Sequence, residues 1–548
     1  MSETPDTYGA YPRLTQAQLA ALGKLGQRRG VPPGATLFAE GDRNCDFFAI
    51  LDGMVALVEA RGTAEERIIS THGRGRFLGE VGLLTGQPAL YSAVATEAAQ
   101  VLAVPVTRLR ELVAADAALG DLILRAYLIR RSILISLGVG VRIIGSRYSP
   151  DARRVRDFVA RNRIPARWLD VEADPGAEQM LAQLGVAPQD TPLVILYGRQ
   201  LLRNPGNAEL ARALGLPAAA GPEAACGLLV VGAGPAGLSA AVYGASEGLE
   251  TVVIDGVATG GQAGTSSRIE NYLGFPSGIS GGELAERAVI QARKFGARFA
   301  VPAEATAIEH CEGRFTVGLA GGTSVTASTV VIAPGARYRR LDVPRLARFE
   351  ETSVYYAASQ AEAQLCRDDP VAVVGGGNSA GQAVVFLASH AARISLIVRE
   401  RDLSENMSRY LISQIERLAN VEILLSTEVR ELLGDQTLDG IVVADNRAGA
   451  TRTVPARALF VFIGAMPCTG WLGGLAQLDD RGFVRTGPDA PQAYSAEPGG
   501  RRSPLEASQP GMFAVGDVRS GSTKRVAAAV GEGAMAIRLA YERMKSGP

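Results

Sequence analysis

Two glycine-rich turns in the second half of the chain have the residue types and spacing to hold nucleotide phosphates. The first turn follows an apolar run and consists of Gly232, Gly234, Pro235, Ala236 and Gly237. Glycine permits a tight turn and lets a pyrophosphate approach the amino end of the next helix. Asp255 ends the following predicted strand, where a carboxylate can accept hydrogen bonds from ribose hydroxyls. This order predicts a dinucleotide site, with a glycine-rich turn that binds nothing as the alternative.

A second turn of the same kind follows the apolar residues 370–374. It consists of Gly375, Gly377, Asn378, Ser379 and Ala380. The strand predicted at residues 394–398 leads into Arg399, and Arg401 lies two residues further on. A carboxylate at this place favours NAD, whereas arginines suit the 2′-phosphate of NADP. The arginines predict NADPH, although Glu400 lies between them, and solvated loop arginines are the alternative.

Residues 227–548 resemble the small, two-domain flavoprotein thioredoxin reductases. Besides the two turns, the resemblance rests on the segments 260–262 (GGQ), 269–272 (IENY), 333–336 (APGA), 462–467 (FIGAMP) and 513–518 (FAVGDV). It implies that the first fold binds FAD and that the second binds NADPH. The chain would leave the FAD fold near residue 340 and return to it near residue 466.

The same resemblance implies roles for residues around the flavin. Gly261 and Gln262 would lie along the isoalloxazine, with Asn271 near its polar edge. Asp517 would hold the ribityl chain, although an aspartate after a strand can also be a simple turn residue. The remaining residues expected at this cofactor are Gly516 and, at the pyrimidine side of the ring, the backbone of Arg525, Val526 and Ala527.

The redox cysteine pair that these reductases carry before the second turn is missing. Residues 354–360 read VYYAASQ, and dithiol exchange needs both an attacking and a resolving thiol. Without the pair, the module resembles the ferredoxin–NADP reductases of the thioredoxin-reductase type, which pass electrons to an external acceptor. Tyr355 or Tyr356 could face the flavin there, with a tyrosine packed in the core as the alternative. Cys366 and Cys468 could form a displaced pair, or each could fill space as a small apolar residue.

The first 140 residues show a different pattern. Short alternating strands broken by Gly and Pro over residues 30–105 indicate an all-β unit. Residues 107–137 then have helical apolar spacing, which would place on one broad face Leu122, Leu124, Leu128, Ile129 and Ile133. Such a helix either pairs two subunits, which would make a homodimer, or packs only on its own domain.

The segment 77–88 (FLGEVGLLTGQP) resembles the phosphate-binding cassette of cyclic-nucleotide-binding domains, as in catabolite activator proteins. The resemblance implies that Glu80, after Gly79, meets a ribose hydroxyl. The arginine expected for the cyclic phosphate is replaced by Tyr91, which precedes Ser92. A buried phosphate without arginine loses its bidentate partner, so cyclic AMP is not expected to bind in the usual mode. Another small effector, or none, is equally consistent with this segment.

Residues 141–216 form a third unit with a βαβαβ pattern. Its strands and first helix are expected at 141–144, 151–161, 168–171 and 191–196. The Thr-Pro before the last strand resembles the glutaredoxin fold and implies a cis Pro192. The thiols of that fold belong at residues 145–150 and are absent, so the unit would serve for docking or as a spacer.

The overall composition excludes several classes of protein. Lys+Arg and Asp+Glu both number 56, and no helix-turn-helix or basic face points to DNA. The 5 cysteines have no metal-binding spacing, and their scatter indicates a reducing, cytoplasmic compartment. No signal-peptide pattern opens the chain, and arginines interrupt its most apolar stretch at 122–144, so no membrane span is expected.

The predicted fold class is multidomain: a β-roll, a thioredoxin-like α/β unit, and two interleaved Rossmann-like α/β domains for FAD and NADPH. The predicted limits are 1–140, 141–216, 224–340 with 466–548 for FAD, and 341–465 for NADPH, with a linker at 216–222. We expect an FAD-dependent NADPH oxidoreductase that resembles thioredoxin-disulfide reductase. It would pass electrons to a ferredoxin-like protein, a quinone or a thiol protein. The alternatives are a flavin-holding sensor without steady turnover and a genuine disulfide reductase with displaced cysteines.

Overall fold

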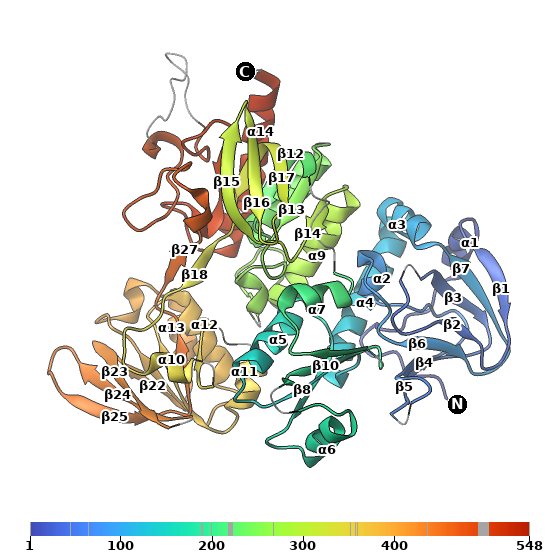
Figure 1. Ribbon diagram of the computed structural model, residues 1–548, viewed down its shortest axis with the longest axis horizontal. Helices are drawn as coiled ribbons and strands as arrows, with labels where there is room; N and C mark the ends of the chain where they lie inside the picture. The colour runs from blue at the N-terminus through green and yellow to red at the C-terminus, as the bar shows by residue number, and fades with distance from the viewer. Residues whose placement is uncertain are drawn as a thin grey trace. The chain divides into compact units, whose positions relative to one another are not determined.

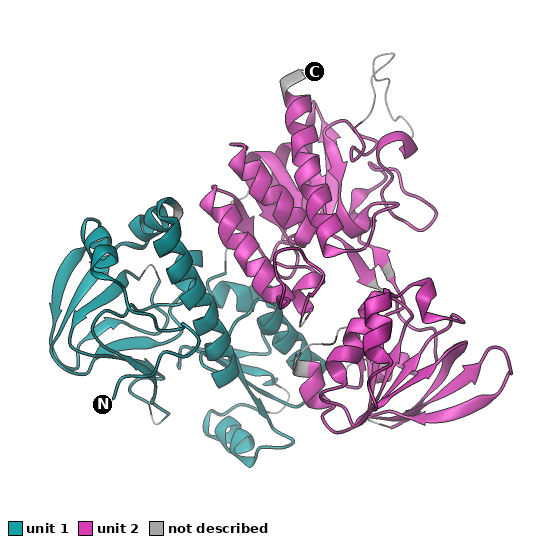
Figure 2. Cartoon of the chain, turned by 180° about the vertical axis from the view of Figure 1, so that it is seen from behind, with its two compact units in different colours: residues 1–219 teal, residues 220–548 magenta. Residues whose placement is uncertain are grey.

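The computed structural model describes most of the chain, in residues 2–43, 45–63, 65–187, 190–198, 200–216, 223–266, 268–350, 352–356, 358, 360–435, 437–490 and 503–546. The chain divides into two compact units, 1–219 and 220–548 (Figure 2). Residues 217–222 of the predicted linker lie outside the described residues. Within the described ranges, no helix has the length and apolar character needed to cross a membrane.

The first unit begins with an antiparallel β-roll, as the strand pattern predicts (Figure 1). Its elements are α1 Gln16–Gly23, β1 Gln27–Val31, β2 Thr36–Phe38, β3 Phe47–Asp52, β4 Val55–Glu59, β5 Arg67–His72, α2 Val81–Thr85, β6 Ser92–Ala95 and β7 Ala99–Val104. Two sheets, with the strand orders β1-β7-β3 and β2-β6-β4-β5, enclose one apolar core. The helix α2 lies inside the predicted cassette.

The helical stretch after the β-roll consists of two helices, not the single predicted one. They are α3, Val106–Ala115, and α4, Ala117–Leu137. The break falls at Asp116, whose carboxylate accepts a hydrogen bond from the backbone N–H of Leu119 at 3.0 Å and so caps α4. The prediction of one helix is wrong because an aspartate that can cap a new helix competes with continuation of the first.

The buried face of α4 also differs from the predicted one. Of the apolar side chains expected to share a face, only Leu128 is buried, and the others are half-buried. Arg130 and Arg131 are buried instead. Arg130 Nε donates to the Ala10 carbonyl at 2.7 Å, and its guanidinium lies 4.5 Å from the centroid of the Phe77 ring. Burial of an arginine is tolerated where carbonyl and aromatic partners are supplied, which apolar spacing alone does not reveal.

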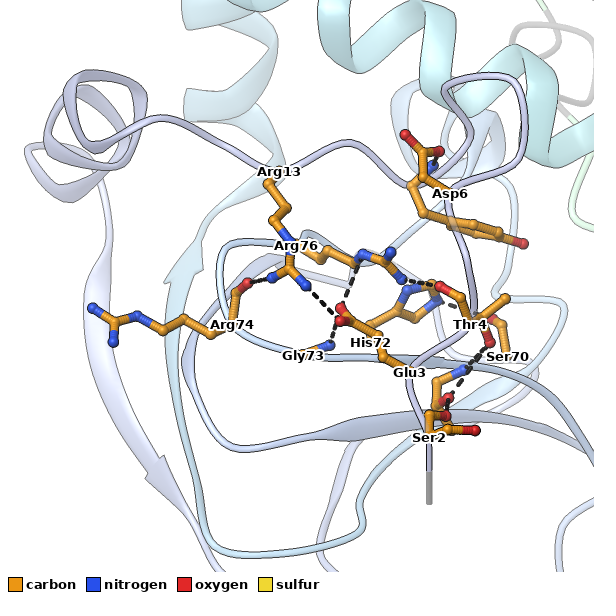
Figure 3. Close-up of polar contacts among 12 residues, drawn as sticks. Ser2, Glu3, Thr4, Asp6, Arg13, Ser70, His72, Gly73, Arg74 and Arg76 are labelled. Carbon is orange, nitrogen blue, oxygen red and sulfur yellow. Dashed lines mark hydrogen bonds and ion pairs between the residues drawn. The ribbon is translucent and has the colours of Figure 1, made fainter.

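Polar contacts fasten the segment before α1 onto the β-roll (Figure 3). Glu3 Oε1 lies 3.0 Å from Arg76 Nε in an ion pair and accepts from the backbone N–H of Gly73 at 2.9 Å. His72 is fully buried beside these groups. Burial, and then the charge of Arg130, hold the pKa of His72 well below its usual value. This histidine is therefore a neutral packing residue at neutral pH.

The remainder of the first unit is a small α/β fold. Its elements are β8 Val141–Gly145, α5 Pro150–Arg161, β9 Ala166–Asp170, α6 Pro175–Gln183, β10 Leu193–Leu196, β11 Gln200–Arg203 and α7 Asn207–Ala213. The sheet order is β11-β10-β8-β9, with β8 and β9 parallel and the other pairs antiparallel. The Thr191–Pro192 peptide is cis, as predicted. The glutaredoxin-like interpretation of this unit stays a prediction.

The second unit contains the two predicted nucleotide folds. The first fold consists of β12 Glu223–Val231, α8 Pro235–Ser246, β13 Thr251–Ile254, α9 Gly281–Lys294, β14 Arg298–Ala300, β15 Ala305–Cys311, β16 Arg314–Leu319, β17 Ser324–Ile332, β28 Met512–Ala514 and α14 Val526–Ser546. Its sheet order is β14-β13-β12-β17-β16-β15, and β28 pairs with β17. The Ser239 hydroxyl of α8 donates to the Val530 carbonyl of α14 at 2.7 Å. The end of the chain therefore completes the first fold.

The second fold lies between the two parts of the first in sequence. Its elements are α10 Leu346–Phe349, β19 Val354–Tyr355, α11 Gln360–Leu365, β20 Pro370–Val374, α12 Asn378–Leu387, β21 Arg393–Ile397, α13 Arg409–Ile415, β22 Val421–Leu424, β23 Thr427–Gly434, β24 Leu438–Asp445, β25 Thr451–Pro455 and β26 Ala458–Val461. A parallel sheet has the order β19-β26-β20-β21-β22, and β23-β24-β25 form an antiparallel one. The two connecting segments pair as antiparallel strands, β18 Ala336–Tyr338 and β27 Ala465–Pro467.

Candidate functional site

Close backbone contacts shape the first glycine turn and exclude side chains from it. Gly232 has φ +109°, and a Cβ there would lie 2.1 Å from the carbonyl oxygen of Ala333, which follows β17. A Cβ at Gly237 would lie 1.8 Å from the Gly232 carbonyl oxygen, so α8 begins directly against the turn. The fold therefore requires glycine at both positions before any ligand is considered.

The segment predicted to lie along the isoalloxazine is adjacent to the same turn. A Cβ at Gly261 would lie 2.9 Å from the Cα of Gly234 and 3.9 Å from Cδ of Pro235. The side-chain amide of Gln262 donates a hydrogen bond to the carbonyl oxygen of Ala336. Residues expected at the phosphates and at the ring thus lie together in one fold.

Asp255 fastens the turn to the end of β13. Its Oδ2 accepts a hydrogen bond from the backbone N–H of Ala233 at 2.9 Å, and its Oδ1 accepts one from Val257 at 3.0 Å. A carboxylate offers about four lone-pair sites, and Oδ1 also accepts from Ala258 at 3.3 Å, so the capacity left for a ribose hydroxyl lies on Oδ2. The sequence predicts only the ribose contact, and the structure adds this scaffold role.

The segment after β28 brings another predicted residue, Gly516, to this turn. A Cβ at Gly516 would lie 2.9 Å from the Cβ of Ala236 in the first turn of α8. The Gly516 backbone N–H donates to Glu532 Oε2 at 2.7 Å, and Arg519 Nη2 donates to Glu532 Oε1 at 2.6 Å. The sequence does not single out Glu532 or Arg519, because only the packing of α14 places them here.

Asp517, which follows Gly516, is a partly buried carboxyl. Burial raises its pKa and the charge of Glu532 raises it further, while Lys524 opposes both. A carboxyl whose charge is poorly solvated gains from hydroxyl donors, which suits the predicted contact with a ribityl chain.

The other residues predicted at the flavin lie closer to the surface. Asn271, Arg525 and Ala527 are exposed, and Val526 is half-buried at the start of α14. Among the described residues, no hydrogen bond joins the Asn271 side chain to the glycine turn. The predicted roles of these four residues beside the ring stay predictions.

The second glycine turn repeats the steric requirement of the first. Gly375 has φ +142°, and a Cβ there would lie 2.4 Å from the carbonyl oxygen of Phe462. By contrast, the atom nearest to a Cβ at Gly377 would be the Asn406 carbonyl oxygen, 4.0 Å away. Backbone atoms therefore fill the space beside Gly375, at the sheet, and leave space beside Gly377, where α12 begins.

Some of the first residues of α12 are buried in the fold, and others are exposed. Asn378 is nearly buried, and its Oδ1 accepts from the backbone N–H of Ser408 at 2.6 Å. Ala380 is fully buried in the core of this fold. Ser379 is exposed and leaves its hydroxyl available at the helix end. Arg399 and Arg401 are exposed as well.

Both turns fit a dinucleotide. The helices α8 and α12 begin after Gly234 and Gly377, and no side chain caps the amino end of either helix. The N–H groups at such an end lack intrahelical partners and, with the helix dipole, favour phosphate oxygens. Because glycine has no side chain, each turn leaves room for phosphates beside the amino end of its helix.

The family assignment follows from comparison with known proteins. Residues 227–533 match the pyridine nucleotide-disulphide oxidoreductases. The chain belongs to this family. Residues 28–116 match the cyclic nucleotide-binding domain, in agreement with the β-roll. The N-terminal β-roll and the nucleotide folds predicted from the sequence are thereby confirmed.

Thioredoxin reductases are among the similar proteins. That of Eremothecium gossypii is 31% identical over 318 residues, which cover 56% of this chain and 94% of the relative. That of Treponema pallidum is 32% identical over 313 residues, covering 57% and 95%. The crystal structure of T. acidophilum thioredoxin reductase has 26% identity and a TM-score of 0.53, covering 59% of this chain and 99% of that one. The chain is an oxidoreductase of this family, whose thioredoxin reductases use FAD and NADPH.

The two tyrosines at the place of the missing cysteine pair have partners within the oxidoreductase fold. Tyr355 is buried in the core of the second fold, 5.3 Å between ring centroids from Phe460, and its hydroxyl donates to the Thr352 carbonyl at 2.8 Å. The Tyr356 hydroxyl donates to Glu350 Oε1 at 2.5 Å. These contacts favour the packed-tyrosine alternative for Tyr355, and a flavin contact of either residue stays a prediction.

Three cysteines of the second unit, Cys226, Cys366 and Cys468, have raised pKa values. Cys366 is 2% exposed in the core of the second fold, and burial raises its pKa to about 12. Burial also raises the pKa of Cys468, and that of Cys226 to about 11. All five cysteines are free. Thiols with raised pKa values remain protonated at neutral pH and are poor nucleophiles.

The cassette of the β-roll holds its acid in a buried ion pair. Glu80 is 4% exposed, and its Oε2 lies 2.6 Å from Nη2 of Arg131 on α4. Arg131 also donates from Nη1 to the Arg163 carbonyl at 2.9 Å, and Arg130 donates from Nη1 to the Gly79 carbonyl at 2.8 Å. The sequence signal for these arginines is that they are two adjacent charges in a mostly apolar helix. A ribose would have to share Glu80 with Arg131.

Tyr91, at the position where the cassette arginine is expected, supplies no positive charge. Tyr91 is 2% exposed and packs 6.0 Å from Phe38 between ring centroids, and burial raises its pKa, so the phenol is neutral. The Ser92 hydroxyl accepts from the backbone N–H of Glu40 at 3.0 Å. Arg110 is among the residues that line the cavity of about 30 Å³ at the cassette.

Proposed function

We propose that this chain passes electrons from NADPH through FAD to an acceptor outside the chain, without a dithiol step of its own. One observation carries the proposal: both nucleotide turns are intact, while residues 354–360 contain no CxxC. When it is bound, FAD is the two-electron carrier.

The residues of the chain serve to bind and orient the cofactors. Support for the flavin site comes from the contacts of Asp255 with the first turn and of Glu532 with Gly516. The protonated thiols of Cys366 and Cys468 give the displaced-pair alternative less support. We therefore place the acceptor outside the chain, as a ferredoxin-like protein, a quinone or a thiol protein.

Anaerobic mixing of the FAD-loaded chain with NADPH tests the proposal. We expect the absorbance of oxidised flavin to disappear while the number of titratable thiols stays constant. New thiols on reduction would show that a displaced cysteine pair is used. The matched control is the thioredoxin reductase of Treponema pallidum under the same conditions.

Reoxidation of the reduced chain by a panel of acceptors then identifies the acceptor class. The panel consists of ferredoxin, a benzoquinone, oxygen and thioredoxin. We expect thioredoxin to fail, because reduction of its disulfide in this family's manner needs an attacking thiolate. Rapid reoxidation by thioredoxin would overturn the proposal.

A flavin-holding sensor is the second candidate, and the β-roll matched at residues 28–116 is the observation that favours it. Flavin that NADPH does not reduce would support this candidate. Adding cyclic AMP or cyclic GMP to the same assay tests for an effector, and we expect no change because Tyr91 replaces the arginine. From the sequence we further propose a cytoplasmic homodimer with the domain limits given above.

A further inference from the structure

Glu400 lies against the second glycine turn. A Cβ at Gly376 would lie 2.9 Å from Glu400 Oε2 and 3.1 Å from Cγ1 of Val398. The Glu400 side chain is 21% exposed, whereas that of Arg399 is 73% exposed. The charged group that contacts this turn is therefore a carboxylate, while the neighbouring guanidinium extends into solvent.

Backbone hydrogen bonds fix the segment that carries Glu400. The backbone N–H of Ser426 donates to the Glu400 carbonyl at 2.9 Å, and that of Thr427 donates to the Val398 carbonyl at 2.9 Å. Arg399 Nη2 lies 3.6 Å from Glu400 Oε1, and an ion pair of an exposed arginine is weak. The carboxylate is thus held at the turn with acceptor capacity left for a ligand.

This position is the one at which a doubly wound fold distinguishes its nucleotides. The segment after the second strand meets the 2′ position of the adenosine ribose, where NADH has a hydroxyl and NADPH a phosphate. Glu400 is the third residue after β21, which ends at Ile397. A carboxylate accepts a hydrogen bond from the hydroxyl. It repels the phosphate and offers that group no donor, whereas arginine would pair with it.

We propose that Glu400 determines the nucleotide selectivity of the second fold. It accepts a hydrogen bond from the adenosine 2′-hydroxyl of NADH and opposes the 2′-phosphate of NADPH. NADH is consequently a reductant of this chain alongside NADPH. The inference rests on the proposed function, because it takes the second fold as the site of a nicotinamide nucleotide.

Calorimetric titration of the FAD-loaded full chain with NAD⁺ and NADP⁺ tests the inference without turnover. In Glu400→Gln we expect the ratio of the Kd for NAD⁺ to that for NADP⁺ to rise about tenfold, as loss of one charged hydrogen bond implies. Glu405→Gln is the matched control, since Glu405 is an exposed carboxylate in the same loop, and its ratio should equal that of the wild type. Glu400→Ser is a second variant and should change the ratio in the same direction.

The outcomes separate this inference from the proposed function. A ratio that is unchanged in both Glu400 variants overturns the inference, even where NADPH still reduces the flavin of the wild type. Failure of both nucleotides to bind the wild-type chain overturns the inference and the proposed function together. A shift of equal size in Glu405→Gln also overturns it, because the effect would then be one of net charge.

Discussion

The two nucleotide turns of the second unit use their acids differently. Asp255 accepts backbone hydrogen bonds from Ala233 and Val257, whereas among the described residues no backbone N–H donates to the Glu400 side chain, which lies against Gly376. One acid is therefore part of the scaffold, and the other remains available to a ligand. The two acids also differ in place, since Asp255 directly follows β13 and Glu400 is the third residue after β21.

We expect the largest effect from a substitution that places a Cβ at Gly232, where neighbouring backbone atoms leave no room in the first turn. Gly232→Ala should destabilise the chain by about 3 kcal/mol or more, because positive φ and overpacking act together, and should abolish FAD retention. Gly375→Ala is the matched variant in the second turn and should keep FAD while weakening the nicotinamide nucleotide. Flavin content after purification and nucleotide titration measure the two effects. Loss of FAD in both variants would contradict the separation of the two sites.

A smaller effect distinguishes the two acids directly. Asp255→Asn leaves one acceptor oxygen where the carboxylate offers two, so at least one of the three backbone N–H groups from which it accepts loses its partner, at a cost of about 1–3 kcal/mol. Glu400→Gln should leave the unfolding temperature unchanged. Thermal unfolding of the FAD-free chains measures both, and equal unfolding temperatures for the two variants would contradict the scaffold role of Asp255.

The pH dependence of stability tests the effect of burying the Asp517 carboxyl. Burial raises its pKa in the folded chain, so the folded state binds the proton more tightly than the unfolded state does. Stability of the FAD-free chain therefore falls as pH rises from the unfolded to the folded pKa of this group. Asp517→Asn should remove this part of the slope and weaken FAD binding. Thermal unfolding from acidic to neutral pH tests this, and a steeper slope in the variant would contradict it.

The smallest expected effect is on electron transfer when the thiols are removed. Cys366→Ala should lower the free energy of unfolding by about 1 kcal/mol, since a small buried side chain is truncated. Cys468→Ser should cost less. Neither variant should change the rate at which NADPH reduces the flavin, measured by stopped-flow absorbance. A large loss of rate in either variant would show that the turns alone do not account for the reaction.

Much of the fold could be predicted from local patterns. The strand–glycine–helix order predicts both turns, and β13 and β20 are observed at the strands expected there. The apolar spacing of residues 107–137 fails twice, because Asp116 starts a new helix and because Arg130 and Arg131 are buried. The cap of Asp116 is local, to Leu119, whereas the buried arginines find their partners in distant parts of the chain, at Ala10 and Glu80.

The sequence by itself determined the family, the two glycine turns, the β-roll and the absence of a CxxC, because these depend on residue types at short spacing. Only the tertiary structure decided how the charged groups are used. It places Glu532 on Gly516, Arg131 on Glu80, and Glu400 on the second turn. Charge pairing depends on distance and burial in space, and neither is encoded by position along the chain.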